Sequence, residues 1–397
     1  MYALRKPFTV ATFENLALWG IDYKILLIIS QSIGYTISKF LGIKIVSEMS
    51  PEKRSISIII LNLIALSSLL VFAIVPYPYN FILMLLNGLP LGMIWGLVFS
   101  YLEGRRQTEL LGAGLSVSFI FSSGVVKSVG KVLMQDFDVT QMWMPFLTGL
   151  IFFIPLVIFV LLLRYLPEPT VEDKLMKTER KPMNSEQRKK LFKEFYPGLV
   201  LLILAYILLT TFRDLRDNFA AEIWAALGYS DSASVFTLTE IPVSILVLII
   251  LSLLIFIKDN YKALVVSHLL IIFGFAITGF STYLFELKIL SPFIWVSCVG
   301  FGLYLGYVPF NSMFFDRLIA SFKYVSNVGF LIYLSDSFGY LGSISILIFK
   351  NFGYQEISWY NFFIQSLYSM SIAGSILVLL ALIYFRYKHK NWVVNER

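Results

Sequence analysis

Long apolar runs separated by short polar gaps constrain what this chain can fold into. A helix needs about 20 residues to cross the hydrocarbon core of a bilayer, and backbone polar groups there must be satisfied within the spanning structure itself. We therefore predict an all-α polytopic membrane protein. Its expected spanning helices cover 22–46, 55–76, 80–102, 111–134, 142–165, 197–228, 233–257, 262–284, 290–315, 324–348 and 360–386.

Composition supports this prediction and excludes other classes. Hydrophobic residues make up 58% of the chain and charged residues only 14%, whereas soluble proteins average about 25% charged residues. The net charge of +7 comes from Lys and Arg in the gaps between apolar runs, so it indicates loop orientation rather than nucleic-acid binding. With one cysteine, Cys298, and two histidines, we expect no metal, no cofactor and no enzymatic activity.

The gaps with many cations predict the orientation of the chain. They are 47–54, 103–110, 166–196, 258–262, 316–323 and the tail 387–397. Because cytoplasmic loops carry an excess of Lys and Arg, we expect these gaps and the C-terminus on the cytoplasmic side of a bacterial inner membrane. The polar segment 166–196 is expected to link two halves, with an amphipathic helix near 185–195.

An internal repeat divides the chain into two halves. A shift of about 208 positions superposes one set of residues and a shift of about 214 superposes GLPLG over 88–92 on GLYLG over 302–306. The glycines of these two words are four residues apart, a spacing that lets helices approach closely in lipid. From the repeat we predict two parallel halves of six helices, 1–165 and 197–386. The pairs at the first shift are Arg5 and Arg213, Glu14 and Glu222, and Gly20 and Gly228.

The repeat also makes residues 1–20 an incomplete first helix. The helix after Pro197 has its mate around these residues, and the repeat assigns that mate a start about a dozen residues before Met1. We therefore expect 1–20 to be the second part of a longer helix.

Arg5 and Arg213 are cations inside apolar helices at matching positions of the two halves. A charge at the bilayer centre costs roughly 2.5–3.5 kcal/mol on insertion scales, and such residues usually face a cavity, a partner or a pathway. Arginine binds phosphate or carboxylate oxygens two at a time. The pair therefore predicts an anion held between the halves. Alternatively, Arg213 pairs with the neighbouring Asp214 or Asp217, whereas Arg5 has no local acid before Glu14.

Four segments resemble a known transporter family. MYALRKPF over 1–8 and GYTISKFLGIKIVSEMSPEKR over 34–54 are similar to the first two helices of the organophosphate:phosphate antiporters, a branch of the major facilitator superfamily. LLTTFRDLRDNF over 208–219 resembles the seventh helix of that family, and FGYLGS over 338–343 resembles the penultimate one. The resemblance implies a major facilitator fold and an anion site. The residues it selects are Tyr2, Arg5, Tyr35, Lys39 and Arg213, with Arg216 as a rival to Arg213.

The loop after the second helix departs from the superfamily pattern. That pattern, Gly-x-x-x-Asp-Arg-x-Gly-Arg-Arg, is replaced here by KIVSEMSPEKR, which keeps only an acid, Glu48, followed by the basic pair Lys53 and Arg54. We expect this loop to gate through altered contacts, or the chain to belong to a bacterial branch with a different substrate.

Further ionisable residues within the spans are candidates for coupling or charge balance. Glu240 either takes up a proton or balances a neighbouring arginine, and we favour the balance. Lys127 extends the positive funnel, and Asp336 is its expected partner. Lys39 contacts either the substrate or an acid on another helix. The complete set is Glu240, Glu14, Glu222, Asp217, Lys127 and Asp336.

These observations predict a monomeric secondary transporter of a small anion in the lipid bilayer. Its sharpest form is exchange of an organic phosphate for inorganic phosphate, since an empty carrier with facing cations switches poorly. A proton-coupled carrier of a carboxylate or sugar is a second hypothesis. A non-transporting membrane sensor of a phosphorylated metabolite, signalling through 166–196, is a third.

Overall fold

The computed structural model describes residues 1–47, 49–102, 108–167, 185–324, 328–354 and 356–395. Within these residues, 11 helices are long and apolar enough to cross a membrane, so the prediction of an all-α polytopic fold is confirmed. The first half holds α2 (Tyr23–Ser47), α3 (Pro51–Ile74), α4 (Phe81–Leu102), α5 (Thr108–Asp136) and α6 (Met144–Leu163). The second holds α8 (Ser185–Asn218), α10 (Val235–Ile255), α11 (Asn260–Glu286), α12 (Pro292–Ser312), α14 (Val328–Gly353) and α15 (Trp359–Asn395).

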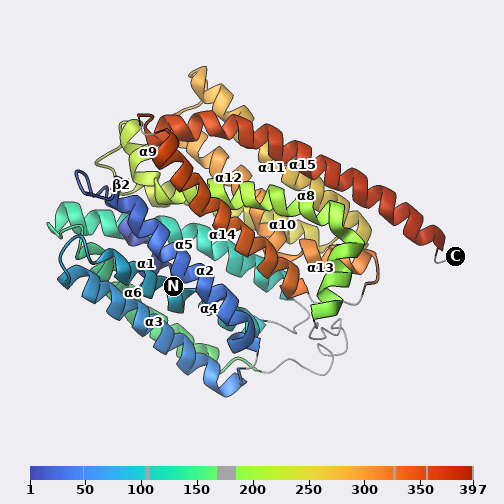
Figure 1. Cartoon of the computed structure of the whole chain (residues 1–397), viewed down its shortest axis with the longest axis horizontal. Helices are drawn as coiled ribbons and strands as arrows, with labels where there is room; N and C mark the ends of the chain where they lie inside the picture. Colours follow the sequence, from blue (N-terminus) through green and yellow to red (C-terminus); the bar gives the residue numbers. More distant parts are fainter. Residues whose placement is uncertain (48, 103–107, 168–184, 325–327, 355, 396–397) are drawn as a thin grey trace.

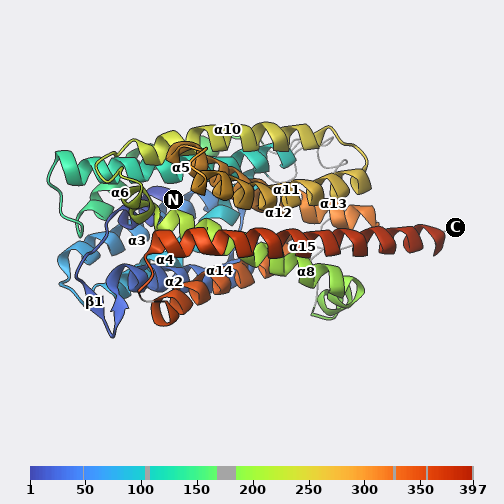
Figure 2. The same cartoon turned by 90° about the horizontal axis from the view of Figure 1, so that it is seen from above.

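The two halves lie side by side, with their helices roughly along one direction (Figures 1 and 2). Across the boundary, α5 packs against α10 and α2 against α14. A small β-hairpin lies at one end of the bundle, and α15 projects from the other (Figure 1). We call these the hairpin end and the tail end.

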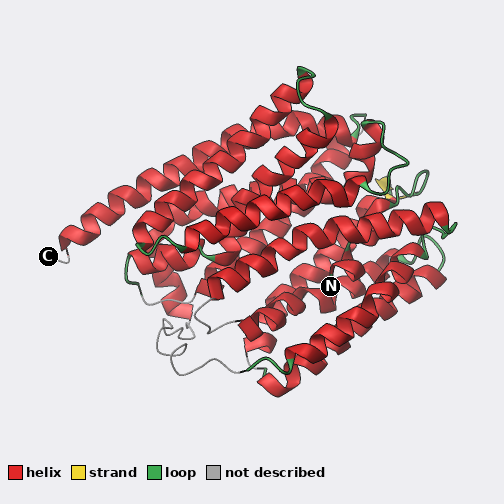
Figure 3. Cartoon of the chain, turned by 180° about the vertical axis from the view of Figure 1, so that it is seen from behind, coloured by secondary structure: helices red, strands yellow, loops and turns green. Residues whose placement is uncertain are grey.

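The N-terminal segment differs from the predicted partial helix over 1–20. It forms a short helix α1 (Tyr2–Arg5), a 3-10 turn η1 (Pro7–Val10) and a hairpin of β1 (Ala17–Leu18) and β2 (Ile21–Asp22). Pro7 offers no N–H to continue the helical hydrogen bonds of α1, and α1 ends at Arg5, with Lys6 as its C-cap. The hairpin pairs Ala17 with Asp22 and Leu18 with Ile21, and is the yellow element in Figure 3.

Left-handed glycines stand at equivalent places in the two halves. Gly20 has a φ of 74° and closes the hairpin loop, and Gly228 has a φ of 85° directly after a short helix, α9 (Ala220–Ala226). Glycine adopts this conformation without a steric penalty.

The predicted helix over 197–228 is wrong in detail. The backbone leaves helical geometry at Phe219, which divides the predicted helix into α8 and α9.

Two predicted boundaries at the tail end also change. The expected amphipathic helix near 185–195 forms the first part of α8, which bends at Phe195, two residues before Pro197, as proline requires. The expected tail 387–397 is not separate from the last span, because α15 continues to Asn395. Lys388 Nζ binds the backbone carbonyl and a side-chain oxygen of Glu194, each at 2.7 Å, and ties this extension to α8. Residues 168–184 of the linker lie outside the described residues.

Glycines bring α2 and α4 into backbone contact. A Cβ atom on Gly34 would lie 2.1 Å from the carbonyl oxygen of Leu85, and one on Gly88 would lie 2.2 Å from that of Gln31. Neither position has room for a side chain, as expected where helices approach closely. This crossing fixes α2, which carries Tyr35 and Lys39.

Candidate substrate site between the two halves

A small central cavity lies where the two halves meet. Its free volume is about 40 Å³, enough for only a few water molecules. Except for Arg216, the residues that the resemblance selected all line it. The lining is Met1, Tyr2, Arg5, Tyr35, Lys39, Trp95, Ser116 and Phe119 from the first half, and Arg213, Tyr307, Asn311, Asp336 and Tyr340 from the second.

Polar side chains from two other helices hold the backbone that carries Arg5. Because α1 stops before Pro7, the carbonyls of Leu4 and Arg5 lack the usual helical donors. Asn87 Nδ2 of α4 donates to the Leu4 carbonyl at 3.1 Å, and Gln31 Nε2 of α2 donates to the Arg5 carbonyl at 3.1 Å. Gln31 also donates to Asn87 Oδ1 at 2.7 Å. These three hydrogen bonds hold in place the backbone segment that carries Arg5.

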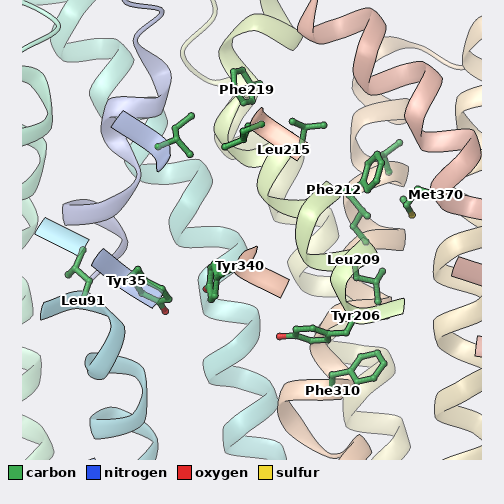
Figure 4. Close-up of a cluster of buried hydrophobic side chains, with 14 of the residues drawn as sticks. Tyr35, Leu91, Tyr206, Leu209, Phe212, Leu215, Phe219, Phe310, Tyr340 and Met370 are labelled. Carbon is green, nitrogen blue, oxygen red and sulfur yellow. The ribbon is translucent and has the colours of Figure 1, made fainter. Parts of the chain in front are cut away.

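The Arg5 guanidinium has no carboxylate partner among the described residues. It is only 6% exposed, and its Nε makes no hydrogen bond. Its Cζ lies 3.9 Å from the ring centre of Tyr35 and 5.7 Å from that of Tyr340. These two rings come from opposite halves and lie next to each other in Figure 4, with centroids 5.0 Å apart. Arg5 is thus a buried cation that forms no ion pair with a described carboxylate, and Asp214, which is paired with Arg213, acts on it only without direct contact.

Arg213 reaches the same cavity with its charge already balanced. Its Nη2 donates to Asp214 Oδ1 at 2.8 Å, and its Cζ lies 3.9 Å from the ring centre of Tyr307. Asp214 Oδ2 accepts a further hydrogen bond from Ser343 at 3.0 Å. The local pairing considered as an alternative is therefore present, although it leaves Arg213 at the cavity wall.

Lys39 and Asp336 face each other across the boundary between α2 and α14. Lys39 Nζ lies 3.2 Å from Asp336 Oδ2, and Asp336 Oδ1 accepts a hydrogen bond from the Tyr206 hydroxyl. The expected pairing of Asp336 with Lys127 is therefore wrong, because Lys127 lies on α5 and binds Asp217 instead.

Asp217 joins two lysines from the first half. Lys6 Nζ lies 2.6 Å from Asp217 Oδ2, while Lys127 Nζ and the Ser123 hydroxyl bind Oδ1. Lys6 also donates to Asn218 Oδ1 at 2.8 Å. A single carboxylate therefore offsets two buried ammonium groups, which leaves one positive charge in excess.

Arg216 points away from the central cavity, toward α10. Its Nη1 donates to Glu240 Oε1 at 2.7 Å, so Glu240 stands where the charge-balance interpretation puts it. The pair lines a separate pocket of about 20 Å³ with Lys127. Between the rival arginines, Arg213 is therefore the one at the cavity.

The remaining predicted residues lie outside the cavity. Glu222 is paired with Lys24 at 2.6 Å near the hairpin end, and Glu14 is exposed there. At the tail end Lys53 is exposed, and Arg54 Nη1 donates to the Ser100 carbonyl at 3.2 Å. Glu48 lies outside the described residues.

Sequence reasoning missed several lining and supporting residues. Tyr307, Tyr340 and Trp95 line the cavity, but aromatic residues are too frequent in this chain to stand out. Gln31 and Asn87 had a usable signal, since each is an amide inside an apolar helix, where an unpaired polar group is costly.

The central region carries more cations than acids. Six buried cations, Arg5, Lys6, Lys39, Lys127, Arg213 and Arg216, accompany four buried carboxylates, Asp214, Asp217, Glu240 and Asp336, which leaves a surplus of two positive charges. The surplus comes from Arg5 and from the pair of lysines that share Asp217. An anionic ligand would balance it.

Solved structures of two transporters are similar to this chain in fold. A D-xylose-proton symporter superposes with a TM-score of 0.60 at 16% identity, covering 96% of this chain and 94% of that one. The nucleoside transporter NupG superposes with a TM-score of 0.60 at 15% identity, covering 96% and 95%. The chain has the membrane fold of major facilitator transporters. It belongs to a family of unknown function, DUF5690, whose sequence model matches residues 7–388. No curated protein matches its sequence significantly.

Proposed function

We propose that this protein is a secondary transporter that carries a small organic anion by alternating access. The observation that carries the proposal is Arg5, a buried cation without an acidic partner among the described residues, in a cavity that it shares with Arg213 and Lys39. A buried charge without a partner is costly. A ligand anion between the halves would remove that cost.

The charge surplus favours a dianion. A phosphate monoester carries about −1.5 to −2 charges near pH 7. The buried groups have a surplus of two positive charges, one on Arg5 in the cavity and one on the lysines that share Asp217, which do not line it. Arginine forks suit phosphate oxygens. The aromatic walls of the cavity, among them Tyr307 and Tyr340, would contact an organic group. The sharpest form of the proposal is therefore exchange of an organic phosphate for inorganic phosphate.

Two ion pairs between the halves, one near the hairpin end and one in the wall of the cavity, suit alternating access. Lys24 and Glu222 form the first pair, and Lys39 and Asp336 form the second. Opening toward one end would break one pair and keep the other, as in rocking of two halves around a fixed site.

The orientation and oligomeric state belong to the same proposal. We infer that the tail end faces the cytoplasm of a bacterial inner membrane, because cytoplasmic segments are rich in Lys and Arg. The first turn of α3, which holds Lys53 and Arg54, and the last part of α15, which holds Lys388, lie at this end (Figure 1). A monomer suffices, since one chain supplies both walls of the cavity. Labelling a cysteine introduced at Lys53 with a membrane-impermeant reagent tests the orientation; labelling from outside intact cells contradicts it.

Transport measurements test the proposed function. Proteoliposomes loaded with phosphate should take up labelled phosphate, and Arg5→Lys and Arg213→Lys should each abolish this uptake, because a lysine cannot replace the guanidinium fork. Lys258→Gln, an exposed change outside the cavity and outside the predicted gating loop, is the matched control and should leave uptake unchanged. Phosphate uptake that survives both arginine substitutions would refute the assignment.

A proton-coupled carrier of a carboxylate or sugar is the second candidate. Glu240 supports it, since this buried carboxylate has one oxygen, Oε2, without a hydrogen bond. Such a carrier would accumulate its substrate along a pH gradient and lose that response in Glu240→Gln. A membrane sensor would instead bind phosphate and show no flux in either direction.

A further inference from the structure

We propose that Asp336 is a built-in substitute for the substrate anion, which neutralises Lys39 in the empty transporter and gives way when substrate binds. The inference rests on the proposed function and concerns what allows the empty carrier to return. Asp336 belongs to the second half and Lys39 to the first, and both side chains are 7% exposed.

Asp336 is held by its own half whether or not it binds Lys39. Its Oδ1 accepts a hydrogen bond from the Tyr206 hydroxyl, and that hydroxyl accepts one from Asn311 Nδ2 at 3.0 Å. All three residues belong to the second half, and Asn311 lines the cavity with Asp336. The carboxylate therefore keeps a donor when Lys39 leaves, which reduces the cost of leaving it buried.

Lys39 likewise has other neighbours that stabilise a cation. Its Nζ lies 5.5 Å from the ring centre of Tyr35, 5.6 Å from that of Trp95 and 5.6 Å from that of Tyr333. Aromatic faces within about 6 Å attract an ammonium group. Lys39 can thus change its anionic partner while these contacts persist.

The geometry of the pair contrasts with that of the other buried pairs. Lys39 and Asp336 are 3.2 Å apart, whereas Lys6 and Asp217 are 2.6 Å apart. Asp217 is also bound by Lys127 and Ser123 and lines no part of the cavity, whereas Asp336 faces it. Of these two acids, Asp336 is the one that a ligand anion would meet beside Lys39.

This arrangement changes the expected transport cycle. Without an internal anion, Arg5 and Lys39 of the first half would have to be closed in against the second half with no anion beside them, which is costly for buried charges, and only loaded carriers would switch. With Asp336 on Lys39, the empty carrier closes and returns, so net flux accompanies exchange. Substrate must then compete with Asp336 for Lys39, which weakens its apparent affinity.

Asp336→Asn tests the inference in the full chain, with inorganic phosphate as the probe. Asparagine keeps the size and the acceptor for Tyr206 but loses the charge. We expect phosphate exchange to persist and net phosphate efflux into phosphate-free medium to fall at least about tenfold. Calorimetry should give a phosphate Kd about tenfold lower, a change of about 1.4 kcal/mol, because the internal competitor is gone.

Two further variants sharpen the test. Tyr206→Phe removes the other donor to Asp336, so Asp336 should hold Lys39 more tightly and the phosphate Kd should rise several-fold. Asp136→Asn removes an exposed acid at the end of α5, outside the cavity, and should leave the Kd unchanged.

Different results overturn different statements. An Asp336→Asn protein with wild-type net efflux and an unchanged or weaker phosphate affinity overturns the role of Asp336. If that variant does not fold, an unchanged Kd in Tyr206→Phe overturns it equally. Absence of both phosphate binding and exchange in the wild type instead refutes the proposed substrate.

Discussion

Replacing Arg5 with glutamine separates a ligand-binding charge from a structural one, because the two roles predict stability changes of opposite sign. Arg5 is 6% exposed and has no acidic partner among the described residues. Burying an ion costs several kcal/mol. Its contact with the Tyr35 ring at 3.9 Å returns about 2 kcal/mol when desolvated. Removing the charge should therefore raise the free energy of unfolding by about 1–3 kcal/mol.

The same substitution should weaken phosphate binding. A hydrogen bond to a charged group contributes about 1.5–3 kcal/mol, which corresponds to a phosphate Kd about 10- to 150-fold higher. Unfolding of the purified protein in phosphate-free detergent, followed by tryptophan fluorescence, measures the first change. Titration calorimetry with phosphate measures the second.

Arg216→Gln is the matched control for this experiment. Arg216 is equally buried but is paired with Glu240 at 2.7 Å, so its removal leaves a carboxylate without a partner and should cost about 3–5 kcal/mol of stability. An Arg5→Gln protein that is less stable than the wild type and binds phosphate normally would refute our reasoning, because Arg5 would then be a structural residue.

Two other substitutions test the packing around the site. Asp217→Asn leaves Lys6 and Lys127 without their shared carboxylate and should lower the free energy of unfolding by about 3–5 kcal/mol; Lys127→Met in the same chain should recover part of this loss, and wild-type stability of the single variant would contradict the prediction. Gly88→Ala places a Cβ atom 2.2 Å from a carbonyl oxygen and should cost about 1–3 kcal/mol, seen as a lower melting temperature. Gly114→Ala meets no atom within 4 Å and should be nearly neutral; equal losses at both glycines would argue against the close helix crossing.

Most of the fold follows from hydropathy, because a bilayer restricts spanning segments to long apolar helices. The predicted helix bounds that proved wrong were decided by features at single positions. Pro7 ends the first helix early, a signal that the repeat with 197–228 obscured. The break at Phe219 has no neighbouring proline or glycine that would have predicted it from the sequence. The extension of α15 contacts Glu194, a residue far away in sequence that the apolar pattern of the last span does not indicate.

The candidate site was partly predictable for a related reason. Arg5, Lys39 and Arg213 stand out as cations in apolar helices, and the cavity brings them together. Their partners did not follow from sequence. Positions three apart on a helix differ by only about 60° in direction, so Arg213 and Arg216 were indistinguishable until α10 supplied Glu240 to one of them.

Because Arg213 is paired with an acid and Arg5 is not, the two walls of the cavity differ in charge. Arg213 is already satisfied by Asp214, whereas Arg5 is not. Under the proposed function, an ester with one charged end would enter head first toward the first half, with its organic end against Tyr307 and Asn311 of the second. The two halves would then recognise different ends of the cargo. Changes at Tyr307 would then alter which organic group is accepted more than they alter the affinity for inorganic phosphate.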